Sequence, residues 1–323
     1  MTILQALMNP IASLVLIRIN GGTAMMRILG IVGVQICICV PIIVFQFCKG
    51  KEFFSKEYWG YALRIGIPIV PHYLSGIILN QGDRIMIDKM VGKTEVALYG
   101  LAYSIGMLVQ LFISGMNSAL TPWMYSKIKK GDIRSMRKVL QLLSIVVVGI
   151  AVALMLISPE LVLIFGSPKY REAVYVIPPV AASVFFIFIY NILSMPQFYY
   201  EKTQFLMAAS MAAAGANVVL NFIFIRLFGY IAAGYTTLAC YMLYSVGHYI
   251  VSKRILVKEG IQENLMNPGF LLACSVFLIG ASIICNLIFP YRILRYVILL
   301  ASAGLVFWKK ELLLKTMADI RKK

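Results

Sequence analysis

The chain has 323 residues, of which 61% are hydrophobic and only 13% are charged, and its formal net charge is +17. This balance excludes a water-soluble domain, because no soluble core needs so large an apolar share. A charge of this size would suggest nucleic-acid binding in a soluble protein. Here the basic residues gather between apolar segments, where the positive-inside rule explains them. The composition indicates a polytopic membrane protein with no nucleic-acid partner.

Ten apolar segments follow one another along the chain, most of them close to the roughly 20 residues that cross a bilayer as a helix. They lie near residues 3–18, 24–48, 59–81, 96–123, 139–158, 173–199, 204–225, 229–252, 269–289 and 291–308. The connecting segments 82–95 and 160–172 mix apolar with charged residues and are expected to lie along the outer membrane interface. The predicted fold class is an all-α transmembrane bundle of about ten spans.

The basic residues indicate how these spans are oriented. One set of connecting loops, together with the C-terminal tail, holds 19 of the 30 Lys and Arg residues. The opposite set holds ten, and the one basic residue that remains, Arg64, lies inside a span. Because cytoplasmic loops carry the excess of Lys and Arg, the first set is predicted to be cytoplasmic, with both chain termini on that side.

Four spans carry polar side chains at helical spacing, so that each set shares one helix face. The sets are Tyr99, Tyr103, Gln110, Ser114, Asn117 and Thr121; Ser183, Tyr190, Ser194 and Gln197; Thr203, Ser210, Asn217 and Asn221; and Thr237, Tyr241, Tyr244, His248 and Ser252. Such stripes either hydrogen-bond packed helices to one another or line a water-filled cavity. Four stripes on four spans favour a cavity.

The third span carries an arginine and two prolines. Arg64 lies roughly 7–8 Å into the span at 1.5 Å per residue. A buried arginine is costly there, so it either faces a cavity or reaches back to the headgroups. Pro68 and Pro71 remove backbone hydrogen bonds and bend the helix, as a static kink or as a moving hinge.

No motif of an enzyme is present: the sequence lacks phosphate-binding, hydrolase and zinc-protease signatures and paired carboxylates. We therefore expect no catalytic residue and no cofactor. The six cysteines form no CxxC pair, so no metal site is expected either. All 13 acidic residues are placed in loops or at span ends by this reading of the spans.

Residues 53–106 resemble the polysaccharide-export branch of the multidrug/oligosaccharidyl-lipid/polysaccharide exporter superfamily, the flippases of O-antigen and capsule repeat units. The resemblance rests on an IPxxPHxLS…LNQxDRxMI pattern, formed by Ile67, Pro68, Pro71, His72, Leu74, Ser75, Leu79, Asn80, Gln81, Asp83, Arg84, Met86 and Ile87. It implies two six-helix lobes around a cationic cavity, alternating access, and undecaprenyl-diphosphate-linked oligosaccharide as cargo.

Members of this family usually have 12 or 14 spans, and only two spans here precede the second lobe. We expect residues 1–52 to be the last two spans of an incomplete first lobe. Residues 53–255 are then the six-span second lobe, and 256–323 the final two spans with a basic tail. The chain is expected to be the carboxy-terminal portion of a longer transporter.

The resemblance and the polar stripes together give candidate site residues. Arg64 is the candidate for the cargo diphosphate. The candidates for glycan contact are Gln110, Asn117, Asn217, Asn221 and Tyr241. Pro68 and Pro71 are the candidate hinge, and Asp83 with Arg84 the candidate gating pair. The expected partners are the lipid-linked oligosaccharide, membrane lipids, a polysaccharide polymerase and a chain-length regulator, in the bacterial inner membrane.

Two other functions fit parts of the sequence. A cation-coupled exporter of small molecules belongs to the same superfamily, but such pumps usually place a carboxylate within a span. A non-transporting scaffold of a polysaccharide assembly complex is the second alternative, since half of the cavity wall is expected to be missing.

Overall fold

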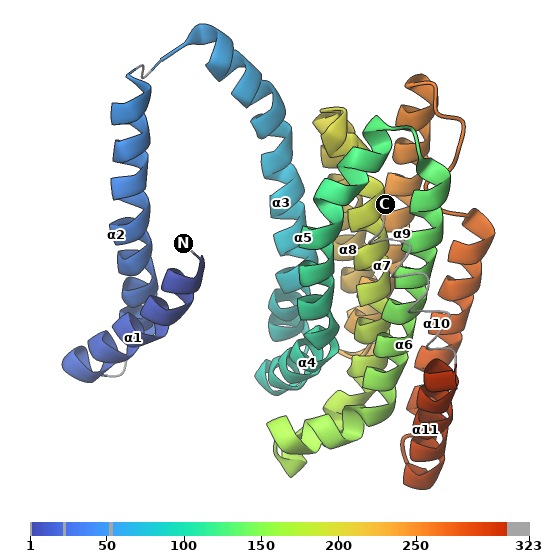
Figure 1. Cartoon of the computed structure of the whole chain (residues 1–323). Coiled ribbons are helices and arrows are strands. Elements are labelled where there is room, and N and C mark those ends of the chain that lie inside the picture. The colour runs from blue at the N-terminus through green and yellow to red at the C-terminus, as the bar shows by residue number, and fades with distance from the viewer. Residues whose placement is uncertain (1, 22–23, 52–53, 309–323) are drawn as a thin grey trace. The chain divides into compact units, whose positions relative to one another are not determined.

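The computed structural model describes residues 2–21, 24–51 and 54–308, and this part of the chain is helical throughout, with no strand (Figure 1). The helices are α1 Thr2–Asn20, α2 Ala24–Gly50, α3 Lys56–Met90, α4 Lys93–Gly106, α5 Leu108–Lys129, α6 Ile133–Phe165, α7 Ile177–Tyr199, α8 Thr203–Phe228, α9 Ala232–Lys258, α10 Pro268–Ile288 and α11 Arg292–Trp308, with a 3-10 helix, η1, at Pro168–Val176. The predicted all-α membrane bundle is confirmed.

Contacts divide the chain into two units, Met1–Arg64 and Ile65–Lys323. In the first unit α1 and α2 form a close hairpin. A Cβ atom on Gly30 would lie only 2.7 Å from the backbone of Ser13, so glycine is what lets the two helices approach. The Ser13 hydroxyl also donates to the carbonyl of Arg27 at 3.3 Å. The expected three-part division of the chain stays a prediction.

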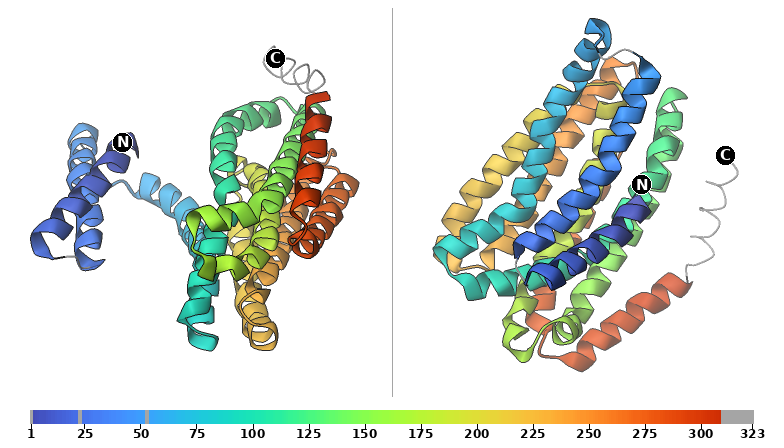
Figure 2. Two further views of the ribbon diagram at one scale, coloured as in Figure 1. Left: turned by 90° about the horizontal axis from the view of Figure 1, so that it is seen from below. Right: turned by 90° about the vertical axis from the view of Figure 1, so that its left-hand side faces the viewer.

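The second unit is built around α7. This helix is apolar on all sides, and its residues from Ile177 to Ile189 are buried without a break. A helix with that pattern is stable only where other helices surround it. Its neighbours are α5, α6, α9 and α10, and the long helices of this unit run side by side in both views of Figure 2.

Seven helical segments within the described residues are long and apolar enough to cross a membrane. They are Met25–Gly50, Lys56–Met90, Lys93–Lys129, Ile133–Phe165, Pro168–Tyr199, Thr203–Phe228 and Pro268–Ile288. A helix also stands at each of the other three expected spans, as α1, α9 and α11. Of these three helices, the 27-residue α9 is the most polar, because it carries a polar stripe. The stripe faces the interior of the bundle, where α9 packs between α7 and α8.

The expectation that residues 82–95 form an interface segment is wrong for its first part. Helix α3 continues through Met90, and both Asp83 and Ile87 are fully buried. The reason is a four-residue spacing of buried side chains that runs on past the predicted end of the span at residue 81, as Ser75, Leu79, Asp83 and Ile87. Since a step of four keeps side chains on one helix face, this part of α3 packs into the bundle.

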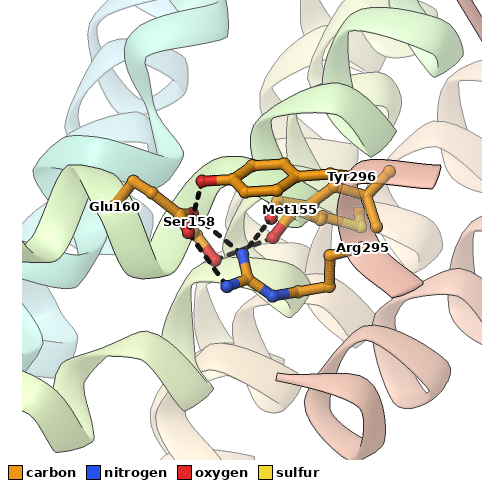
Figure 3. A network of polar contacts seen from close by, with 6 residues as sticks. Met155, Ser158, Glu160, Arg295 and Tyr296 are labelled. Atoms are coloured by element: carbon orange, nitrogen blue, oxygen red, sulfur yellow. Dashed lines mark hydrogen bonds and ion pairs between the residues drawn. The ribbon is translucent and has the colours of Figure 1, made fainter. Parts of the chain in front are cut away.

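A polar network joins α11 to α6 (Figure 3). The guanidinium of Arg295, which is 3% exposed, donates to both carboxylate oxygens of Glu160, at 2.8 and 2.9 Å, and to the carbonyl of Leu156 at 2.7 Å. The Tyr296 hydroxyl donates to the same carboxylate at 3.0 Å. This two-pronged contact fixes the orientation of α11 as well as its position.

Gly106, at the break between α4 and α5, is predicted to be sensitive to substitution. A Cβ atom on Gly106 would lie 2.7 Å from Cγ1 of Val180, so α4 touches α7 directly there. Gly106→Ala should lower the thermal unfolding midpoint of the purified protein by several degrees, since overpacking costs about 1–3 kcal/mol. Gly115→Ala, where the added methyl group meets open space, should leave the midpoint unchanged. Equal midpoints for the two variants would contradict the close contact.

Candidate functional site

A buried carboxylate lies at the junction of α3, α4, α8 and α9. Asp83 Oδ2 accepts hydrogen bonds from the hydroxyls of Tyr99 at 2.5 Å and Thr237 at 2.6 Å. Its Oδ1 accepts one from the side-chain amide of Asn221 at 2.6 Å. All four side chains are fully buried. The group therefore replaces its lost water with three donors from three other helices, as burial of a charge requires.

The cluster extends to a second asparagine on α8. The Asn221 amide also donates to Oδ1 of Asn217 at 3.1 Å, and the Thr236 hydroxyl donates to Oδ1 of Asn221. The Nδ2 atom of Asn217 is buried and has no hydrogen-bond partner among the described residues. The cluster thus has one unsatisfied polar atom in an otherwise complete network.

Exchange of a proton or a small cation at Asp83 would require this hydrogen-bond network to rearrange. The donors already direct their hydrogens at Asp83, so a proton on the carboxylate would displace one of them. A hard cation prefers oxygen ligands, and the two asparagine amides would have to turn their oxygens toward it. Within the described residues, no three His, Cys, Asp or Glu side chains gather as a metal-binding cluster.

Next to this cluster lies a groove of about 640 Å³, which we call the polar groove. Its walls come from α3, α4, α7 and α9 and carry no Asp, Glu, Lys or Arg side chain. The residues that line it are His72, Tyr73, Gly76, Ile77, Leu79, Asn80, Gln81, Tyr103, Met107, Tyr190, Asn191, Ser194, Phe198, Tyr241 and Tyr244. The groove therefore offers aromatic rings, hydroxyls and amides but no net charge.

Hydrogen bonds hold the groove side chains in place. Asn80 Oδ1 accepts from the hydroxyls of Tyr103 at 2.7 Å and Tyr241 at 3.2 Å. The rings of Tyr190 and Tyr241 are stacked, with 9° between their planes and 6.3 Å between their centres. Side chains fixed in this way lose little further conformational freedom when a ligand binds.

A histidine pair follows the groove along α3 and α9. His72 Nδ1 lies 2.5 Å from the Ser210 hydroxyl and 3.0 Å from the Tyr244 hydroxyl. His248 Nδ1 lies 2.8 Å from Gln197 Nε2, deep between α7 and α9. Each ring thus has a neutral polar partner. Neither has a carboxylate partner among the hydrogen bonds and ion pairs of the described residues.

A family model described as "Polysaccharide biosynthesis protein" matches residues 1–129, and a model described as "MatE" matches residues 68–223. The two matches overlap over the segment that carries Asp83 and the α3 wall of the polar groove. The chain belongs to the multidrug/oligosaccharidyl-lipid/polysaccharide exporter superfamily.

Two relatives come from Haemophilus influenzae. A protein named for the Lsg locus is 28% identical over 172 residues, which is 50% of this chain and 41% of that protein. An uncharacterized membrane protein is 29% identical over 167 residues, 48% of this chain and 40% of the relative. The match thus spans about two fifths of the length of each relative. No solved structure matches this superfamily member.

The residues of this superfamily member that were predicted to contact the glycan lie in three places. Tyr241 lines the polar groove, whereas Asn217 and Asn221 belong to the Asp83 cluster. Gln110 and Asn117 lie half-buried on α5, and neither lines the groove; one buried oxygen of each lacks a hydrogen-bond partner among the described residues. Both functions considered for the polar stripes are therefore found: some stripe residues line a groove, and others form hydrogen bonds between helices.

Arg64 and the two prolines lie on α3. Arg64 is exposed, belongs to the first unit and forms no described ion pair. Pro68 and Pro71 remain inside the helix, and the Ser75 hydroxyl donates to the carbonyl of Pro71 at 2.7 Å. That bond gives one carbonyl of the proline segment a second partner.

Asp83 and Arg84 do not form a pair with each other. Arg84 donates to Gln81 at 2.7 Å, and its guanidinium lies 5.0 Å from the ring centre of Tyr103, a groove residue. Adjacent residues point about 100° apart on a helix, so one turns into the bundle and the other toward the edge of the groove. The expected gating pair is thus replaced by two separate contacts.

Asn80, Tyr99 and Thr237 are site residues that were not predicted from the sequence. Tyr99 and Thr237 stood in the stripes, but nothing in a stripe says which polar group it meets. The spacing from Ser75 through Leu79 to Asp83 was the signal that the carboxylate faces inward.

Proposed function

We propose that this chain takes part in moving undecaprenyl-diphosphate-linked oligosaccharide across the bacterial inner membrane for O-antigen, capsule or exopolysaccharide synthesis. The observation that carries the proposal is the uncharged, aromatic polar groove in a member of an exporter superfamily. Aromatic side chains offer apolar faces beside a polar edge, and hydroxyls and amides both donate and accept hydrogen bonds. Sugars present the same mixture of C–H faces and hydroxyls.

The proposed roles divide along the chain. The polar groove contacts the glycan through Tyr241 and its neighbours, while Arg64 binds the diphosphate. In the proposed orientation both termini are cytoplasmic. A polysaccharide polymerase and a chain-length regulator are the proposed protein partners, since they would receive the cargo on the outer side.

The experiment is a chromosomal replacement in the bacterium that encodes the chain. Tyr241→Ala should lower surface polysaccharide about tenfold and raise lipid-linked glycan in membrane extracts, since tenfold corresponds to about 1.4 kcal/mol of lost contact. Arg64→Ala should do the same, and Arg64→Lys should retain part of the activity because a point charge still attracts phosphate. Tyr291→Ala, at an exposed site in the α10–α11 turn, is the matched control.

Two outcomes of this experiment would reject the proposal. Deletion of the gene without accumulation of lipid-linked glycan would exclude a role in its export. If that result were joined by copurification of the chain with the polymerase from the parent strain, the non-transporting scaffold would be favoured.

A second candidate function is a cation-coupled exporter of small molecules. Such exporters usually place a carboxylate within a span, and Asp83 is a carboxylate that is fully buried inside α3. Asp83 could act as a coupling group in either export function. The two functions are therefore distinguished by the molecule that is exported and not by this carboxylate.

A further inference from the structure

A second groove lies at the end of the bundle where α8 begins and α9 ends. Its volume is about 820 Å³, and we call it the basic groove. Four cations line it, Lys202, Lys253, Arg254 and Lys258, against the single carboxylate of Glu259. All four are exposed, and none takes part in an ion pair among the described residues. The positive charge of the groove is therefore available to a ligand.

The wall beneath these cations is apolar. Phe205 is 50% exposed, Ile250 45% and Val257 42%, and all three line the same groove. Lysine and arginine stems that cover apolar surface while their charged ends point outward are typical of the headgroup region of a membrane. A free ion would use the cations and leave the apolar wall without a role.

An apolar cleft of about 260 Å³ adjoins the basic groove. It lies between α7, α9 and α10, and its lining includes Phe186, Ile189, Val246 and Leu272. Tyr249 lines both spaces, so the cleft and the groove meet at this side chain. A charged mouth that leads past a tyrosine into an apolar cleft matches a molecule with an anionic head and a hydrocarbon tail.

The position along the helices fits the same ligand. The α7–α8 and α9–α10 connections lie at one end of the second unit, together with the α5–α6 connection (Figure 1). That end carries the loops predicted to be cytoplasmic, and basic pockets between helices on the cytoplasmic side commonly bind anionic lipid headgroups.

We propose that the basic groove binds the phosphate headgroup of an anionic phospholipid, with an acyl chain in the apolar cleft. This proposal does not depend on the cargo of the polar groove. The site would tie the end of the bundle where α8 begins and α9 ends to the anionic lipids of one leaflet.

The test uses lipid quenching of a single tryptophan beside the groove. The full chain carries Trp59→Phe, Trp123→Phe, Trp308→Phe and Phe205→Trp and is reconstituted in phosphatidylcholine bilayers. Brominated phosphatidylglycerol should quench the tryptophan at least twofold more strongly than brominated phosphatidylcholine at the same mole fraction. Replacement of the four groove cations by Gln should abolish that preference.

The matched control replaces four other exposed cations, Lys129, Lys130, Arg134 and Lys138, by Gln, and should keep the preference. Native mass spectrometry of the chain with its own tryptophans should retain phosphatidylglycerol, and lose it in the groove variant. Equal quenching by the two lipids, or equal loss in both quadruple variants, would overturn the proposal.

Two competitors identify the ligand class. Inorganic pyrophosphate in solution should not displace the brominated phosphatidylglycerol. A polyprenyl diphosphate at the same mole fraction should not displace it either. Displacement by pyrophosphate would make the groove a free-phosphate site, and displacement only by the polyprenyl lipid would make it a cargo site; each result would overturn the phospholipid assignment.

Discussion

Asp83→Ala is expected to destabilise the purified protein by roughly 3–9 kcal/mol, because it removes the acceptor of three buried donors at about 1–3 kcal/mol each. The donors are the hydroxyls of Tyr99 and Thr237 and the amide of Asn221. Asp83→Asn keeps one acceptor oxygen and should lose less. The measurement is thermal unfolding in a fixed detergent.

The control for this prediction lies on the same helix. Asp88 is exposed near the end of α3, and Asp88→Ala should change stability by no more than about 0.5 kcal/mol. If Asp83→Ala unfolds at the same temperature as Asp88→Ala, the carboxylate is not the centre of the cluster.

The same pair of variants tests coupling. If Asp83 exchanges a proton or cation during export, Asp83→Asn should be well folded yet export little, whereas Asp88→Asn should be active. Full export by a folded Asp83→Asn protein would leave the cluster with a structural role alone.

Arg295→Ala is expected to cost roughly 3 kcal/mol, since removal of one member of a buried ion pair leaves the other without its partner. The value is at the lower end of the range because Glu160 is 26% exposed and can regain water. Helix α11 should also become easier to cleave, because its contact with α6 passes through this network. The measurements are the unfolding midpoint and the rate of limited proteolysis near residue 290.

Two further variants test whether the loss of stability in Arg295→Ala comes from the two-pronged ion pair. Arg295→Lys keeps the charge but not the two-pronged bond, so it should lie between the wild type and Arg295→Ala. Arg292→Ala, at an exposed position one turn earlier where the guanidinium lies 5.5 Å from the ring centre of Tyr296, should cost much less than Arg295→Ala. Proteolysis of Arg295→Ala at the wild-type rate would show that apolar contacts alone hold α11.

The sequence was sufficient to predict the helices, because transmembrane hydropathy is a local property. It also predicted that Asn217, Asn221 and Tyr241 share inward faces, since helical spacing is local too. It did not predict that the asparagines meet Asp83, because a face does not identify its neighbour. The pairing of Arg295 with Glu160 joins residues 135 positions apart, and no local pattern encodes it.

The largest error in the prediction from sequence was the position of Asp83, and it came from a misplaced helix end. The span that begins at Trp59 was ended at residue 81 because charged residues follow, and that placed Asp83 in a loop. Burial of the next turn against α8 and α9 outweighs the local polarity. A tertiary contact therefore decided where the helix ends.

The inward polar stripe of α9 has a practical consequence for anyone who tags this protein. A count that keeps only segments of high mean hydropathy leaves α9 out, although the sequence pattern as a whole predicts it, and each omitted crossing reverses the inferred side of everything that follows. Reporter enzymes fused after residue 258 would then be assigned to the wrong compartment, although the experiment itself was sound. A fusion in the α8–α9 turn near Gly229, compared with one near Gly260, resolves the parity directly, because the two reporters should give opposite signals.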